Sequence, residues 1–291
     1  MNRSKSVACH PVRHGERGLT LVELLVALAL GLIVLLGVVY VFSGARASHR
    51  HQESYSAIQE SGRIALEIVS RDVRMAGYTG CGNVAFMDHA SGPSVPPVPG
   101  AWVFNNDVVI TGTDGGAGSD DLTIVRGSNE QTTVVATPAL NQITLTSVAA
   151  LEANAALAAG DPLLVSDCSF TEVAVVQAVA GNVVTLQADL SRAVRAGSPV
   201  MRLERVRFNR DANGQLLRNG VAIVSGVQNF QVLYGIMTPA SQRSAERYVV
   251  AGDPAFVPAN VVSVKLRIDV ADGNIPARSF NTTLALRNRA P

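Results

Sequence analysis

The sequence predicts an α+β fold in which one long amino-terminal helix precedes a β-rich globular region. Residues 24–42 form an uncharged, proline-free run, and a helical apolar pattern continues behind it to about residue 76. From about residue 108, short β-prone runs alternate with Gly, Asn and Asp turn signals. The expected organisation is a basic segment over residues 1–18, a helix over 19–76 and a β-rich head over 77–291.

Residues 24–42 have the length and composition of a membrane-spanning helix. They number 19, and an α-helix of that length reaches roughly 28 Å, close to the thickness of a bilayer's hydrocarbon core. Four basic residues precede the run: Arg3, Lys5, Arg13 and Arg17. Because positive charge keeps its end of a span in the cytoplasm, we expect a single crossing with the remainder of the chain exported.

Glu23 stands at the start of this apolar run, where a charge is costly unless it finds a partner. A secretory signal peptide would have a shorter apolar core and a small-residue cleavage site, and residues 43–45, Ser-Gly-Ala, match that site weakly. A plain signal anchor would fit the length of the run. Neither alternative gives a reason for Glu23.

The segment from Gly18 to Ala27, GLTLVELLVA, resembles the class III signal of type IV prepilins. The resemblance implies that a prepilin peptidase cuts after Gly18 and that the new terminal residue, Leu19, is N-methylated. The family usually has Phe at this first mature position, whereas this chain has Leu. Glu23 is then the fifth mature residue, and the resemblance implies that its carboxylate lies near the terminal amine of a neighbouring subunit. Two such charges in apolar surroundings are tolerated only when paired, so the pair would set the register of assembly.

The second half of the helix is amphipathic, with apolar residues spaced by three, four and seven. The predicted buried stripe consists of Ala57, Ile64, Ile68 and Met75, widened by Ile58, Ala65, Val69 and Val73. The predicted exposed face carries Glu60, Arg63, Glu67, Arg71 and Arg74. Gly77 should end the helix.

Four basic or titratable residues follow the span: Arg46, His49, Arg50 and His51. Their position favours contact with lipid head groups. The two histidines are also metal-ligand types, but a solvated turn at the membrane interface is the favoured interpretation.

The head is predicted to consist of short strands joined by tight turns. The expected strands cover residues 108–111, 122–126, 132–136, 142–146, 163–166, 172–180, 183–187, 200–208, 215–218, 227–234, 247–250, 261–270 and 279–286. The segment from Asp211 to Gly214 predicts a hairpin turn. Short helices are expected within residues 149–159 and 190–196.

Three cysteines suggest one structural bridge. Cys9 lies in the basic leader, whereas Cys81 and Cys168 lie in the exported region, where disulfides persist. A disulfide between Cys81 and Cys168 is therefore favoured over two separately buried thiols.

Composition argues against several function classes. Removing residues 1–18 would change the basic and acidic counts from 24 and 23 to 20 and 22, so no general nucleic-acid footprint is expected. We find no HExxH, CxxC, GxSxG or Walker motif, and His89 is the only histidine beyond the cluster at residues 49–51. We therefore expect no catalytic residues, metal or cofactor.

Two segments partly match calcium-binding loops. Residues 115–122, GGAGSDDL, match one unit of a repeat that binds calcium only in stacks, so a connecting loop is favoured. Asp211, Asn213 and Gly214 match part of another calcium loop whose closing glutamate is missing, so the hairpin turn is favoured.

Among pilin-like proteins the chain resembles the PilW family of minor pilins. The resemblance covers the signal and helix, then the segment from Arg71 to Cys81, RDVRMAGYTGC, and the region from Gly160 to Ser169. It implies a non-enzymatic subunit in a single-pass inner-membrane arrangement with a periplasmic head. It also implies a role with other minor pilins and the major pilin in starting type IV pilus assembly, and incorporation into the surface pilus. A type II secretion pseudopilin, which shares signal and fold, and a membrane-tethered periplasmic enzyme or receptor remain as alternatives.

Overall fold

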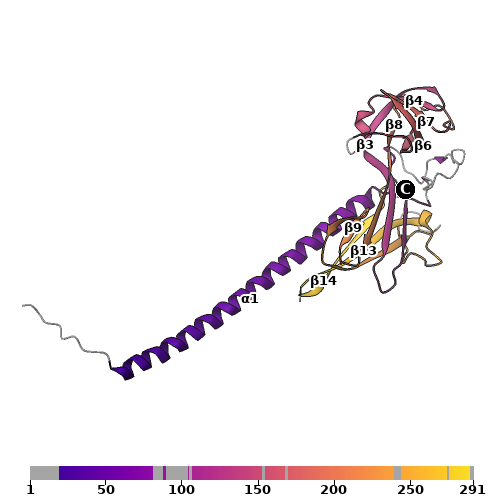
Figure 1. Ribbon diagram of the computed structural model, residues 1–291. Helices are drawn as coiled ribbons and strands as arrows, with labels where there is room; N and C mark the ends of the chain where they lie inside the picture. The colour runs from indigo at the N-terminus through magenta and orange to yellow at the C-terminus, as the bar shows by residue number, and fades with distance from the viewer. Residues whose placement is uncertain are drawn as a thin grey trace, which may run out of the picture. The chain divides into compact units, whose positions relative to one another are not determined.

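The computed structural model describes residues 20–80, 88–89, 104, 107–152, 155–167, 170–238, 244–273 and 275–288. The chain forms two compact units, Met1–Glu53 and Ser54–Pro291. A single helix, α1 (Leu21–Arg74), contributes its first part to one unit and its last part to the other. The helix and the β-rich region after it confirm the predicted α+β fold (Figure 1).

The strands all lie in the second unit. The first seven are β1 (Asp88–His89), β2 (Ile110–Thr113), β3 (Asp121–Ala139), β4 (Gln142–Leu145), β5 (Pro162–Ser166), β6 (Phe170–Ala180) and β7 (Val183–Leu186). The others are β8 (Pro199–Arg210), β9 (Leu216–Arg218), β10 (Val221–Val224), β11 (Val227–Ile236), β12 (Arg247–Val249), β13 (Val261–Asp272) and β14 (Ile275–Ala285). Two short 3-10 helices, η1 (Ala149–Leu151) and η2 (Pro258–Asn260), lie between strands.

Helix α1 ends where the glycine signal predicts. Gly77 has a positive φ of 71°, a conformation that favours glycine and ends helices. The side chain of Asn288 donates to the carbonyl oxygen of Ala76 at 3.1 Å, which satisfies one of the free carbonyls at the helix end. The chain then lies beside β3, because the N–H of Gly77 donates to the oxygen of Val125 and the oxygen of Tyr78 accepts from Gly127.

The buried face of α1 contains the four residues that widen the predicted stripe, Ile58, Ala65, Val69 and Val73, but not the centre of that stripe. The buried residues are Ile58, Gly62, Ala65, Val69, Asp72 and Val73. Ala57 and Ile64 are exposed, and Ile68 is only partly buried. The helix is therefore turned by about one residue from the predicted orientation. Gly62 provides the reason, because its missing side chain leaves room for the ring of Phe280 on β14.

Six antiparallel strands close into a small barrel. β3 pairs with β4, β4 with β7, β7 with β6, β6 with β5, and β5 with β8, and β8 returns to β3. Closure removes the free strand edges that would otherwise pair with other chains. Fully buried residues such as Ile143, Leu163, Val176 and Val184 fill the interior. Figure 1 shows β3, β4, β6, β7 and β8 gathered at one end of the second unit, away from β9, β13 and β14.

Two long strands, β3 and β8, connect this barrel to the rest of the head. Their register is regular from Leu122 to Gly127 and shifts before Gln131. The hydroxyl of Ser128 bridges the irregularity, donating to the oxygen of Glu130 at 2.7 Å and accepting from the N–H of Arg202 at 3.2 Å. Such a bulge bends a strand and increases its twist. The same two strands therefore serve both the barrel and the sheet beneath it.

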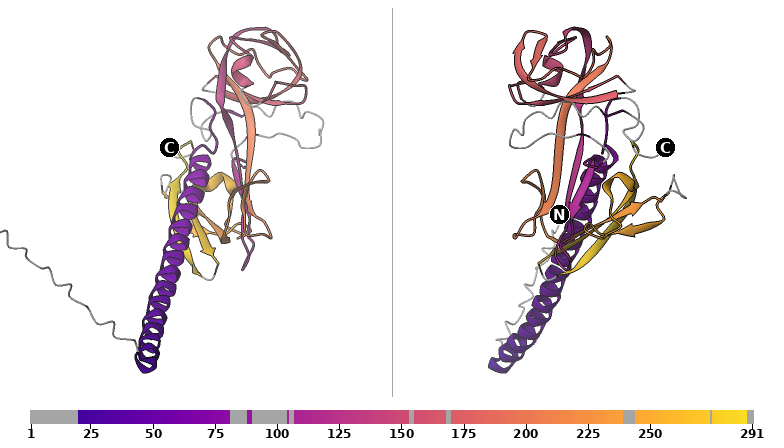
Figure 2. Two further views of the ribbon diagram at one scale, coloured as in Figure 1. Left: turned by 60° about the vertical axis from the view of Figure 1, so that its left-hand side comes forward. Right: turned by 90° about the vertical axis from the view of Figure 1, so that its right-hand side faces the viewer.

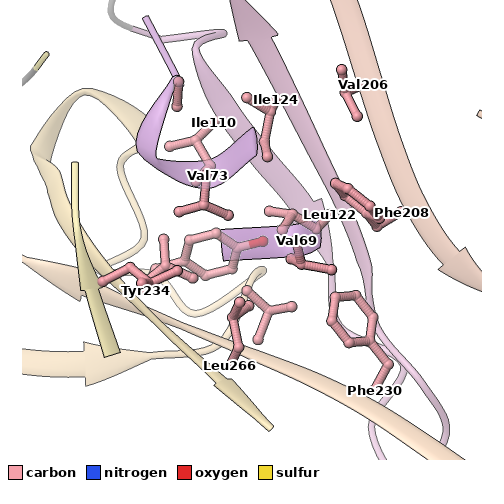
Figure 3. Close-up of a cluster of buried hydrophobic side chains, with 14 of the residues drawn as sticks. Val69, Val73, Ile110, Leu122, Ile124, Val206, Phe208, Phe230, Tyr234 and Leu266 are labelled. Carbon is pink, nitrogen blue, oxygen red and sulfur yellow. The ribbon is translucent and has the colours of Figure 1, made fainter. Parts of the chain in front are cut away.

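Below the barrel, two sheets and the last part of α1 enclose the main core. One sheet is formed by β2, β3, β8, β9 and β10, and the other has the order β12-β11-β13-β14. Both views in Figure 2 place the yellow carboxy-terminal strands beside the last part of α1. Figure 3 shows Val69 and Val73 of α1 among Ile110, Leu122, Phe208, Phe230, Tyr234 and Leu266. Burying these apolar side chains attaches the helix to the head.

Most predicted strands are present, with three corrections. The predicted strands 122–126 and 132–136 are one continuous strand, β3, because both halves pair with β8. Strands β1 and β10 were not predicted, and β10 pairs with β9 through a turn at Asn219 and Gly220, both with positive φ. Of the two predicted short helices, the described part of residues 149–159 contains only η1, and residues 190–196 contain none. The hairpin turn from Asp211 to Gly214 is confirmed between β8 and β9.

Candidate functional site

The first turn of α1 carries the residues of the predicted signal that the structure describes. The hydroxyl of Thr20 accepts a hydrogen bond from the backbone N–H of Glu23 at 3.3 Å. This spacing is that of a capping box, in which Ser or Thr caps a helix and Glu stands three residues later. Glu23 lies in the first turn and is exposed. The cleavage and methylation residues, Gly18 and Leu19, lie outside the described residues.

The segment behind Glu23 is apolar and exposed along its length. Leu24, Ile33 and Tyr40 are 53%, 65% and 81% exposed, respectively. Among the described residues, α1 is the one helix long and apolar enough to cross a membrane. So much exposed apolar surface requires a covering of lipid or of other helices. Gly31, Gly37 and Gly44 leave open space on this segment, because nothing lies within 4 Å of an added side chain.

Residues that follow this segment contact neighbours on the same helix. The guanidinium of Arg46 lies 4.3 Å from the centre of the Phe42 ring. Nδ1 of His49 lies 3.3 Å from Oε1 of Glu53, one turn further on. In the part of the chain that the structure describes, no group of three or more His, Cys, Asp and Glu side chains is placed to hold a metal ion.

A cluster of buried charges attaches the last turns of α1 to the sheet. Asp72 is 5% exposed, and its carboxylate accepts a hydrogen bond from Nε of Arg218 on β9 at 2.7 Å. Nη2 of Arg126 on β3 lies 3.4 Å from the same carboxylate and 3.0 Å from Glu204 on β8. The hydrogen bond from Arg218 to Asp72 raises the pKa of that guanidinium above its ordinary value. We call Asp72, Arg126, Glu204 and Arg218 the helix anchor.

The anchor is electrically balanced but not fully satisfied. Two guanidinium groups face two carboxylates, and Arg126 also donates to the side chain of Asn129 at 3.2 Å. Within the described residues, Nε of Arg126 is buried without a partner. Burying an ion pair costs desolvation free energy, and the attraction between the charges offsets this cost only when their geometry is good. Buried ion pairs therefore favour one packing of the helix over alternative packings. The anchor thus fixes which turn of α1 faces strands β3, β8 and β9.

The predicted disulfide residues, Cys81 and Cys168, lie outside the described residues. Their described neighbours approach the same strand end. Gly80 packs so closely on Met201 and Pro199 that an added side chain would overlap Met201. On the other side of β8, Val165 pairs with Val200, and β5 ends one residue later at Ser166. The disulfide itself stays a prediction.

The two partial calcium motifs have structural roles. In the loop before β3, Asp120 accepts the N–H groups of Gly115 at 2.9 Å and Val232 at 2.7 Å. Burial is the largest cause that raises its pKa, and the neighbouring Asp114 raises it further. In the hairpin, Asp211 accepts the N–H groups of Asn213 and Gln215. Both carboxylates thus hold turns together. For His89 the structure gives the backbone, which pairs with Thr171.

The anchor was missed when the sequence was read alone. A signal for it exists, because Asp72 stands three residues after Val69 and four before Ala76, on the buried face of α1. A carboxylate at such a position predicts a buried cationic partner. Which arginine provides it depends on strand pairing, because Arg218 lies 146 residues away in sequence.

Comparison with known proteins finds a family model and a relative that are similar to parts of this chain. Residues 13–39 match the family described as the prokaryotic N-terminal methylation motif. Over 88 residues the chain is 34% identical to the pilin-like protein PilA3 of Thermus thermophilus, covering 30% of this chain and 36% of that protein. The chain thus matches about a third of the length of this relative. No solved structure matches the chain at a significant level.

These matches agree with the geometry of the helix. The matched residues 13–39 include Gly18, Leu19 and Glu23 and extend into the exposed apolar segment of α1. The chain carries a prepilin signal on a pilin-like α+β fold, as type IV pilins and pseudopilins do. Neither match distinguishes the PilW family from other pilin-like families.

Proposed function

We propose that the protein is a non-enzymatic minor pilin that helps to start assembly of type IV pili. The observation that carries the proposal is the N-terminal methylation motif at residues 13–39, placed at the start of one long helix that leads into a β-rich head. In this proposal residues 1–18 are a leader, residues 24–42 span the inner membrane and residues 77–291 lie in the periplasm. The likeness to PilA3 supports a structural rather than an enzymatic role.

Processing follows from the chemistry of the signal. A prepilin peptidase hydrolyses the bond after Gly18 and frees the amine of Leu19, which is then methylated. In the sequence, the resulting amine stands four residues before Glu23, whose carboxylate is exposed. When subunits pack in apolar surroundings, that carboxylate pairs with the amine of a neighbour, because an unpaired charge there is strongly disfavoured. We infer that the neighbours are other minor pilins and the major pilin, at the tip of the filament.

The test replaces the charge and keeps the shape. Glu23→Gln should be processed and methylated like wild type but incorporated poorly into sheared pili, measured by quantitative immunoblot. Glu60→Gln is the matched control, because Glu60 is an exposed carboxylate on the same helix, and it should be incorporated normally. Wild-type incorporation of Glu23→Gln would contradict the assembly role of Glu23.

A pseudopilin of a type II secretion system is the second candidate, because the motif at residues 13–39 supports both. A deletion strain separates them. Loss of surface pili with normal protein secretion supports the minor pilin, whereas loss of secretion with normal pili supports the pseudopilin.

A further inference from the structure

The helix face just beyond the apolar segment of α1 carries two arginines, Arg46 and Arg50, that have no carboxylate partner among the described residues. Arg46, His49, Arg50 and Glu53 are spaced by three, one and three residues, so they lie along one side of the helix. Glu53 pairs with His49. Among the described residues, neither Arg46 nor Arg50 forms a salt bridge with a carboxylate. The two guanidinium groups therefore leave this face with unbalanced positive charge.

The same face adjoins the apolar segment directly. The guanidinium of Arg46 lies over the ring of Phe42, at 4.3 Å from its centre, so the side chain extends back toward the span. Tyr40 is 81% exposed, and both aromatic residues stand at the end of the uncharged run. Aromatic rings followed by arginines are typical of the boundary between hydrocarbon and head groups. An arginine in this position offers several N–H donors to a phosphate group.

We propose that Arg46 and Arg50 bind the phosphates of anionic phospholipids in the leaflet at the carboxy-terminal end of the span. The inference rests on the membrane-spanning part of the proposed function, but not on pilus assembly. Charge complementarity identifies the ligand, because in an anionic phospholipid no cation of the same head group balances the phosphodiester charge, which can therefore pair with these arginines. Continuity with the span identifies its source, because the lipid head groups lie where the uncharged run ends. The bound lipids hold the subunit at a fixed depth before assembly.

The experiment reconstitutes the full-length protein in bilayers and measures which lipids contact it. Spin-labelled phosphatidylglycerol and spin-labelled phosphatidylcholine are compared by electron paramagnetic resonance, which resolves lipids motionally restricted at the protein surface. At low ionic strength we expect phosphatidylglycerol to be preferred by about fivefold for each of the two arginines near the charged interface. Raising the salt concentration should reduce this preference, because exposed charges are screened.

Two double variants of equal charge locate the effect. Arg46→Gln with Arg50→Gln should bring the ratio to about one. Arg63→Gln with Arg71→Gln is the matched control, because both residues are exposed on the same helix outside the span, and it should keep the wild-type ratio. Equal loss in both variants, or none in the first, would overturn the proposal.

Two further outcomes separate this inference from the proposed function. A restricted lipid population without phosphatidylglycerol preference would overturn the head-group site and leave the span intact. Absence of any restricted lipid would refute the span itself.

Loss of the preference on adding millimolar inorganic phosphate at constant ionic strength would identify a free-phosphate site and overturn the assignment to lipid.

Discussion

Replacing Asp72 with Asn tests whether the helix anchor holds α1 on the head. Asn keeps the size of the side chain and one acceptor oxygen but removes the charge that faces Arg218 at 2.7 Å and Arg126 at 3.4 Å. Removing one partner of a buried ion pair costs about 3–5 kcal/mol. Two features reduce that cost here. The Arg218 side chain is 33% exposed, and Arg126 keeps Glu204 at 3.0 Å.

We therefore expect Asp72→Asn to lower the free energy of unfolding by about 2–3 kcal/mol. For a domain of this size, that corresponds to a fall in Tm of about 5–10 °C. The full-length protein in detergent is followed by near-UV circular dichroism, which reports tertiary packing. Glu67→Gln is the matched control, since Glu67 is an exposed carboxylate on the same helix, and its effect should stay within about 0.5 kcal/mol.

Hydrogen exchange and a double variant provide two further tests of the helix anchor. Asp72→Asn should reduce protection in the last turns of α1 and in β9, while the barrel core around Leu163 and Val184 keeps its protection. The double variant Asp72→Asn with Arg218→Gln should lose less stability than the sum of the two single variants, because the pair is already broken. A Tm within about 1 °C of wild type, or strict additivity, would show that the anchor does not stabilise the helix.

Three further predictions concern the head. Gly62→Val should destabilise the protein by about 1–3 kcal/mol, because the new side chain meets the ring of Phe280; an unchanged urea midpoint would contradict the tight approach of α1 and β14. Because the pKa of Asp120 is raised in the folded state above 3.8, folding favours its protonated form. Wild type should therefore gain stability relative to Asp120→Asn as the pH falls from about 7 toward about 4. A loss of relative stability over this pH range, measured by urea titration, would contradict the raised pKa of Asp120. Finally, peptides containing Cys81 and Cys168 should be linked in mass spectra before reduction and separate after it; alkylation of both thiols without reduction would exclude the bridge.

The elements set by local pattern were predictable from the sequence. The start of α1 follows from the apolar run and Glu23. Its end follows from Gly77, because glycine readily adopts the positive φ that this residue has at the helix end. Most strands follow from alternation, as in β13, where Lys265 and Arg267 are exposed between buried neighbours. The signal at residues 18–27 was equally local, and the match at residues 13–39 agrees with it.

Features set by distant contacts were not predictable in the same way. The helix has two apolar stripes one residue apart, and the choice between them depends on Phe280 and on the arginines of the anchor. The barrel closes through the pairing of β3 with β8, whose partners are 66 to 86 residues apart in sequence, and no local pattern specifies that ring. Strand β10 consists of four residues that are all apolar, Val-Ala-Ile-Val, so it shows no alternation of polar and apolar side chains.

The most direct test of the central claim is the mass and amino-terminal sequence of the mature protein from cells with and without prepilin peptidase. The proposed function predicts a chain that begins at N-methylated Leu19 when the peptidase is present and at Met1 when it is absent. A chain that begins at Met1 in both strains would contradict it, and the protein would then be a plain signal-anchored protein.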